Sequence, residues 1–111
     1  MDILQLERFV ALAETGQFRR AARVLGISQP ALTHSIKTLE DELGAPLFDR
    51  SLRGALLTDV GQGLLARARA IINERNRMLE EVGDLQSQAH GRLTVGVAPY
   101  FSRRLFPAAV A

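Results

Sequence analysis

The chain of 111 residues contains 47% hydrophobic residues and carries a formal net charge of +2 at pH 7, which predicts one small folded domain plus an appendage and excludes a disordered chain. It contains no cysteine, so disulfide bonds and thiolate metal sites are excluded. Because the sequence shows neither a signal peptide nor an apolar run of ~18 residues, we expect a cytoplasmic protein.

Two helices are predicted at the start of the chain. The first runs from about Leu4 to Glu14 and ends at Gly16. Its apolar residues recur at helical spacing and predict a core-forming stripe of Leu6, Phe9, Val10 and Ala13. A short amphipathic helix follows from Phe18 to Leu25, and its start is poorly capped because Gln17 is longer than the small polar residues that cap helices well.

The segment from Ser28 to Gly44 predicts the helix around which the rest of the chain is organised. Ser28 is a good N-cap, Pro30 is tolerated in a first helical turn, and Gly44 is a natural C-terminal stop. One apolar stripe marks the side to be buried and consists of Leu32, Ile36, Leu39 and Leu43. Gly26 allows a tight turn before this helix, which is typical of a helix-turn-helix.

The opposite side of this helix is polar and free of acids. Its first turns carry Gln29, Pro30, Thr33, His34 and Lys37, next to the positive end of the helix dipole. From residue 19 to residue 39 the chain carries only basic charges, and Glu40, Asp41 and Glu42 follow immediately. A basic face that ends in an acidic helical tail suits one-sided docking on a polyanion, and the alternative is a solvated arginine-rich face.

A two-stranded wing is predicted after this helix. The apolar pair Leu47-Phe48 and the run at 55–57 are separated by a turn at 51–54, which is typical of a hairpin. Arg50 and Arg53 lie near its tip, where arginine can follow a phosphate backbone or enter a minor groove. For Arg50 the alternative is an ion pair with a nearby acid such as Asp49 or Glu40.

A long helix is predicted from Asp59 to about Gln88, with Thr58 as its N-cap and a length of ~45 Å at 1.5 Å per residue. Its apolar stripe has heptad spacing, is interrupted by Arg75, and includes Leu64, Ala68, Ile71, Met78, Val82 and Leu85. We expect the small domain to be too short to cover this stripe, so a second copy of the chain is the simplest partner. These six residues are therefore predicted to form a dimer interface.

The last residues predict the beginning of another domain. A strand is expected over 92–98 and a helix from Phe101 onward. One strand and one helix cannot form a domain, so we expect the chain to be part of a longer protein.

The landmarks of the first 65 residues resemble a known family. They are FRRAARVLGISQPALTHSIKTLEDELGAPLFDR at 18–50, Arg53, and LTDVG at 57–61, and together they resemble the N-terminal winged helix-turn-helix of LysR-type transcriptional regulators. The resemblance implies a mainly α fold: three helices plus a two-stranded wing, followed by a long linker helix that pairs antiparallel in a dimer. It implies a winged helix-turn-helix domain at 1–58, a linker or dimerisation helix at 59–89, and the start of an α/β effector-binding domain at 90–111.

Sequence-specific binding of double-stranded DNA is the function that these observations favour, with the helix at 28–44 in the major groove. The Gln29 amide can hydrogen-bond an adenine edge, while Pro30 and the Thr33 methyl group can touch a thymine methyl group. The expected DNA-binding residues are Ser28, Gln29, Pro30, Ala31, Thr33, His34, Lys37, Arg50 and Arg53. The resemblance implies binding to an interrupted dyad by a homodimer, or by a tetramer of the full-length protein, and a small-molecule effector outside this fragment.

Other functions have less support. The rival is a dimeric protein-interaction module that has lost DNA binding, which an acid-bearing face on the helix at 28–44 would favour. Catalysis is not expected, because neither His34 nor His90 has a nucleophile or a paired carboxylate at a suitable spacing. Two histidines without cysteine also make a metal site improbable, and no cofactor is expected in this fragment.

Overall fold

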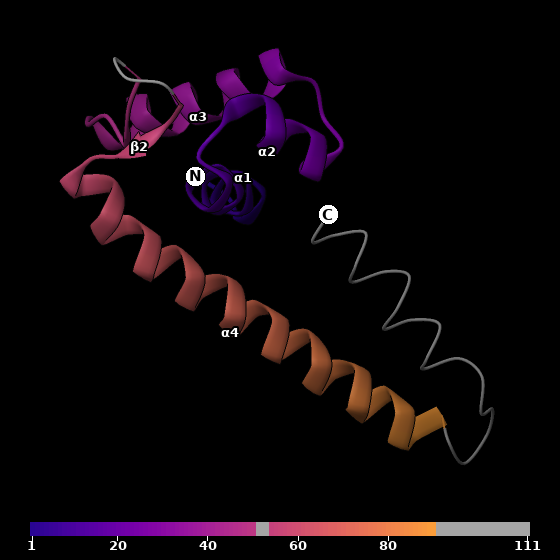
Figure 1. The fold of residues 1–111 in the computed structure, drawn as a ribbon. Coiled ribbons are helices and arrows are strands. Elements are labelled where there is room, and N and C mark those ends of the chain that lie inside the picture. The colour runs from indigo at the N-terminus through magenta and orange to yellow at the C-terminus, as the bar shows by residue number, and fades with distance from the viewer. Residues whose placement is uncertain (51–53, 91–111) are drawn as a thin grey trace. The chain divides into compact units, whose positions relative to one another are not determined.

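The computed structural model describes residues 1–50 and 54–90. The elements follow in the order α1 (Ile3–Thr15), α2 (Phe18–Leu25), α3 (Gln29–Leu43), β1 (Phe48–Asp49), β2 (Leu56–Leu57) and α4 (Asp59–His90) (Figure 1). This order confirms the predicted mainly α fold of three helices, a two-stranded hairpin and a long helix. The expected wing tip at 51–53, the strand at 92–98 and the helix from Phe101 lie outside the described residues.

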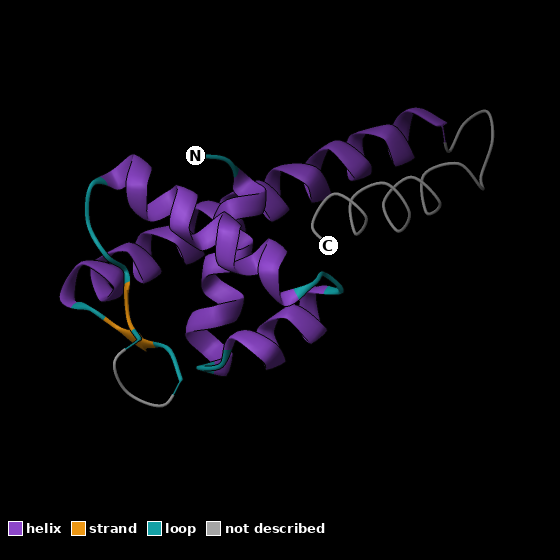
Figure 2. Ribbon diagram, turned by 90° about the horizontal axis from the view of Figure 1, so that it is seen from above, coloured by secondary structure: helices purple, strands orange, loops and turns teal. Residues whose placement is uncertain are grey.

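Residues 1–72 form one compact unit, and the residues after 72 are assigned to a second unit. The core of the first unit is built where α1, α2 and α3 pack against one another and against the segment that leads into β1 (Figure 2). Its largest fully buried side chains are Phe9, Leu12, Leu32, Ile36, Leu39 and Leu47. Phe9 also meets Phe48, with ring centroids 5.4 Å apart, so β1 is packed directly on α1.

The predicted stripe of α3 is buried at three of its four positions. Leu43 is 40% exposed, so the prediction that it is buried is wrong. The reason is its place in the last turn of α3, immediately before Gly44, which takes a left-handed conformation (φ 73°) and turns the chain away. Ser35 is the buried polar residue of α3, and Arg8 of α1 donates a 3.3 Å hydrogen bond to its hydroxyl oxygen.

Local signals set the ends of the helices. Asp2 and Gln5 form a capping box at the start of α1, while α2 has no side-chain cap at Gln17, as the sequence predicts. The turn between α2 and α3 contains Gly26 in a left-handed conformation (φ 70°). The Ser28 hydroxyl oxygen then accepts a 3.2 Å hydrogen bond from the Ala31 amide, which confirms Ser28 as the N-cap of α3.

The base of the wing is fastened by hydrogen bonds of the backbone and of the Thr58 side chain. The two strands are antiparallel, with Phe48 opposite Leu57 and Asp49 opposite Leu56. The Thr58 amide donates to the Leu47 carbonyl at 3.0 Å, and the Thr58 hydroxyl donates to the Pro46 carbonyl at 2.7 Å. The same hydroxyl oxygen accepts from the Gly61 amide at 3.1 Å, so Thr58 both closes the wing and caps α4.

The first turns of α4 pack on the domain that precedes them. Ala68 is fully buried in the core, and Leu64, Leu65 and Ile72 pack against it. The expectation that Ala68 faces a second copy of the chain is therefore wrong, because the core of residues 1–72 encloses it completely. Leu64 is only half-buried, and its place in a dimer interface stays a prediction. The exposed members of the predicted stripe are Ile71, Met78, Val82 and Leu85. No helix in residues 1–50 and 54–90 has the length and apolar character needed to cross a bilayer.

Two glycines in the first two turns of α4 differ in what surrounds them. A Cβ atom on Gly61 would collide with the Leu47 carbonyl oxygen and lie 2.9 Å from a Leu57 methyl carbon, whereas nothing lies within 4 Å of one on Gly63. We expect Gly61→Ala to lower the free energy of unfolding by about 1–3 kcal/mol through overpacking. Gly63→Ala should raise it by about 0.5–1 kcal/mol, since alanine favours the helix. Urea unfolding of both variants measures the difference, and a change of the same sign in both would contradict this packing.

Candidate nucleic-acid interface

The residues of the predicted polar face of α3 lie side by side on one surface of the protein. A shallow, open depression is lined by Gln29, Pro30, Thr33, His34 and Lys37. All of these side chains are exposed except Thr33, which is half-buried. Ser28 and Ala31, also exposed, lie at the start of the same helix, so the structure brings together every predicted site residue of α3. We call this surface, residues 28–31, 33, 34 and 37, the α3 face.

The start of α3 is suited to a negatively charged ligand. Its N-cap and first turn are exposed, and no acidic residue lies in that turn. The free amides and the dipole of a helix N-terminus favour anions such as phosphate. Because the Ser28 oxygen accepts the Ala31 amide, its hydroxyl hydrogen remains available to a phosphate oxygen.

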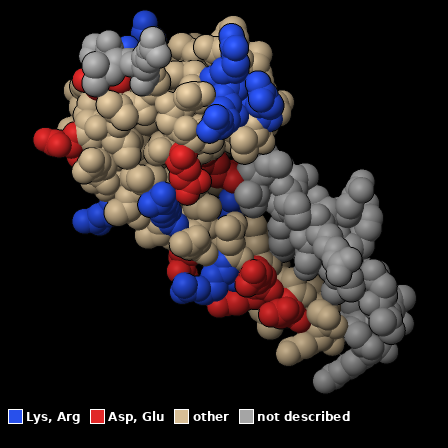
Figure 3. Space-filling model, in the orientation of Figure 1, with Lys and Arg blue, Asp and Glu red and all other residues tan. Residues whose placement is uncertain are grey.

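A cluster of arginines on α2 adds positive charge. Arg19, Arg20 and Arg23 are exposed, and among the described residues no ion pair or hydrogen bond engages their side chains. Figure 3 shows Lys and Arg side chains gathered where α2 and the start of α3 lie in Figure 1. The expected site residues did not include these arginines, although the acid-free run from residue 19 to residue 39 was a signal for them. Their shared exposure appears only in the folded helix.

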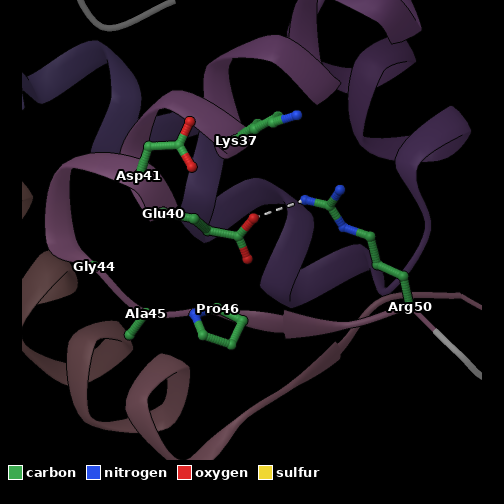
Figure 4. A pocket seen from close by; sticks show the side chains of 7 residues that line it. All are labelled: Lys37, Glu40, Asp41, Gly44, Ala45, Pro46 and Arg50. Carbon is green, nitrogen blue, oxygen red and sulfur yellow. Dashed lines mark hydrogen bonds and ion pairs between the residues drawn. The ribbon is translucent and has the colours of Figure 1, made fainter.

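Arg50 is engaged within the protein. Its guanidinium group lies 3.1 Å from a carboxylate oxygen of Glu40 (Figure 4). Its Cζ atom lies 4.9 Å from the centre of the Phe18 ring. The ion pair with Glu40 is one of the alternatives that the sequence leaves open for this residue. Arg53, the other basic residue expected in the wing, lies outside the described residues.

The α3 face offers binding groups but no assembled catalytic or metal centre. Along residues 1–50 and 54–90, no three His, Asp or Glu residues gather where they could hold a metal ion. His34 shares the depression with Thr33 and Lys37, but no hydrogen bond joins it to either of them in the described part of the chain, so no nucleophile–base pair is assembled. The arrangement can therefore bind a polar, negatively charged surface through hydrogen bonds and charge.

Comparison with known proteins identifies the family. Residues 3–62 match the model of the family described as "Bacterial regulatory helix-turn-helix protein, lysR family". The chain belongs to the LysR family. The match covers α1–α3, both strands of the wing and the first turn of α4.

Individual known proteins are similar to most of this chain. The SDS degradation transcriptional activation protein of Pseudomonas sp. (strain ATCC 19151) is 42% identical over 109 residues, which cover 98% of this chain and 36% of that relative. The structure of Vibrio fischeri DarR in complex with DNA is 32% identical, with a TM-score of 0.75, and covers 79% of this chain and 30% of the DarR chain. BenM_DBD in its catB site 1 DNA complex is also 32% identical, with a TM-score of 0.76, over 78% of this chain and 98% of that one.

Proposed function

We propose that this chain is the DNA-binding part of a LysR-type transcriptional regulator, and that α3 lies in the major groove of its operator. The observation that carries the proposal is the α3 face, which is exposed, polar and acid-free at the capped start of the second helix of a helix-turn-helix. The DarR and BenM_DBD structures, which are DNA complexes of similar fold, support it.

The residues of the α3 face divide into those that read bases and those that position the protein. Gln29 is suited to a bidentate contact with adenine, and the apolar parts of Pro30, Ala31 and Thr33 are suited to thymine methyl groups. His34 and Lys37 can reach either a base edge or a phosphate. The Ser28 hydroxyl is suited to a phosphate, as are the arginines of α2, which would fix the orientation of α3 on the duplex.

We propose further that two copies of the chain bind as a homodimer through α4. The exposed apolar residues of α4 support this, since Ile71, Met78, Val82 and Leu85 recur at the spacing of a helix-pairing stripe. By family resemblance the two helices are antiparallel, the operator is an interrupted dyad, and a small-molecule effector binds a domain that follows α4. The relatives matched here are transcriptional regulators, which accords with a regulatory role rather than an enzymatic one.

The salt dependence of DNA binding tests this proposal. A labelled duplex should bind more weakly as salt rises, because each basic side chain on a phosphate displaces counterions. We expect Arg53→Ala to reduce the magnitude of the slope of log K against log salt by about one unit. Arg69→Ala is the matched control, since Arg69 lies 3.2 Å from Glu14 and its charge is already paired.

Three outcomes would contradict different parts of this account. Failure of the wild-type chain to bind the duplex at low salt would overturn DNA binding itself, and an affinity that does not depend on salt would overturn the phosphate contacts. An unchanged slope in Arg53→Ala, with a normal slope in the wild type, would overturn only the contact of Arg53 with the DNA backbone.

A further inference from the structure

One carboxylate near the end of α3 holds the chain that enters the wing. A side-chain oxygen of Glu40 accepts hydrogen bonds from the Leu47 amide at 2.7 Å and from the Phe48 amide at 3.3 Å. Its other oxygen accepts from the Arg50 guanidinium at 3.1 Å. The Glu40 side chain is only 14% exposed, so these donors replace most of the water that an open carboxylate would bind.

Arg50 extends this contact to α2. Its guanidinium lies over the ring of Phe18, the first residue of α2, at 4.9 Å from the ring centre. Phe18 is itself half-buried and packed against the domain core. These three residues therefore connect α3, the residue after β1 and α2, and we call Glu40, Arg50 and Phe18 the Glu40 clamp. Figure 4 shows the Glu40–Arg50 contact.

Buried Leu47 and Phe48 anchor the wing in the core, and the Glu40 clamp adds hydrogen bonds that tie its start to α3. Each strand is two residues long, and so short a hairpin is at best marginally stable by itself. Lys37 of the α3 face precedes Glu40 by one helical turn, and both residues line the same shallow pocket with Arg50 and Pro46 (Figure 4). The clamp thus fixes the point at which the wing leaves the domain. This point lies within one helical turn of Lys37, a residue that would read DNA.

We propose that Glu40 is a positioning residue for DNA binding and that Arg50 acts through it rather than on a phosphate. The pair sets the place of the wing relative to the α3 face, so that both can engage one duplex together. This inference rests on the proposed function, and it assigns a role to an acidic residue that would otherwise only repel DNA. The opposite possibility is that the ion pair with Glu40 keeps Arg50 from contacting DNA. In that case, loss of the Glu40 charge would strengthen DNA binding instead of weakening it.

Glu40→Gln separates these two roles. Glutamine can still accept from the Leu47 and Phe48 amides, but it carries no charge to hold the Arg50 guanidinium. We expect its affinity for a duplex selected by the wild-type chain to fall about tenfold, the cost of one charge-assisted hydrogen bond. Affinity for random duplexes should fall less than about twofold. Removal of a negative charge alone would instead strengthen binding to every duplex.

Asp41→Asn is the matched control. It makes the same change of charge at the next position of α3, lines the same pocket, and makes no hydrogen bond to the wing in the part of the chain that the structure describes. Its binding to both kinds of duplex should stay the same or strengthen slightly. Urea unfolding of both variants, measured beside the binding assays, checks that each one is folded under the conditions used.

Substitutions of Arg50 give a second, independent readout. Arg50→Ala should weaken binding to the selected duplex and leave the salt slope unchanged, because a residue that contacts no phosphate releases no counterion. Arg50→Lys keeps the charge opposite Glu40 and should recover part of the affinity. The double variant Glu40→Gln/Arg50→Ala should have the same affinity for the selected duplex as whichever single variant binds less tightly. The two effects should not add, because both substitutions break the same contact.

These measurements distinguish failure of the clamp from failure of the proposed function. If the wild-type chain discriminates among duplexes but Glu40→Gln binds as Asp41→Asn does, or more tightly, the positioning role is overturned and DNA binding stands. A loss of about one unit of salt slope in Arg50→Ala would likewise place Arg50 on a phosphate and overturn the inference. If the wild-type chain binds no duplex, the inference fails together with the proposed function.

Discussion

Ile71→Glu is expected to convert the proposed homodimer into a monomer. Ile71 is 43% exposed on α4 and is the first exposed apolar residue of the predicted stripe. A glutamate there would bury an unpaired charge on dimerisation, which costs several kcal/mol, about 3–5 kcal/mol where such losses have been measured. Sedimentation velocity at micromolar concentration should show the change directly. Affinity for a duplex with two half-sites should fall by about 10²–10⁴, because the avidity of linked modules is lost.

Binding to a single half-site should survive this substitution, because Ile71 lies outside the set of buried core residues. Asn73→Glu is the control, since Asn73 is also exposed on α4 but points away from the stripe by its helical position. If Ile71→Glu remains a dimer at micromolar concentration, α4 is not the interface. Substitution of Ala68 cannot serve this test, since a charge in the core would unfold the domain.

Gln29→Ala is expected to reduce discrimination between DNA sequences by about 1–3 kcal/mol, the worth of a good bidentate base contact. Gln29 is exposed in the first turn of α3, beside the Ser28 cap, so the fold should be unaffected. The measurement compares dissociation constants for the selected duplex and for duplexes with single altered base pairs. Gln62→Ala is the matched control, because Gln62 is an exposed glutamine on α4 outside the α3 face. An equal loss on selected and random DNA would contradict base reading by Gln29.

Much of the fold follows from short-range signals in the sequence. The Ser28 cap, the left-handed glycines at 16, 26 and 44, and the apolar periodicity of α1 and α3 each act within one or two helical turns. For this reason the order of elements and the exposed α3 face could both be predicted. The division between a buried and an exposed, acid-free side of α3 needed only helical spacing and the absence of acids.

The remaining features depend on contacts between distant segments. Ala68 is buried in one core with side chains of α1–α3 and of the segments at the wing, which no periodicity within α4 reveals. Glu40 stands in a run of three acids that look alike in sequence, and only the fold brings the Leu47 and Phe48 amides and the Arg50 guanidinium to one of them. The close approach of Gly61 to the Leu47 carbonyl has the same origin.

The most direct test of the central claim is selection from a pool of random duplexes, followed by sequencing of the molecules that the chain retains. If α3 reads the major groove, the wild-type chain should enrich a common sequence, and rising salt should reduce total retention. Gln29→Ala should retain DNA with a weaker preference at one or two positions of that sequence. Retention without any common sequence, or no retention at low salt, would contradict the assignment of sequence-specific DNA recognition to α3.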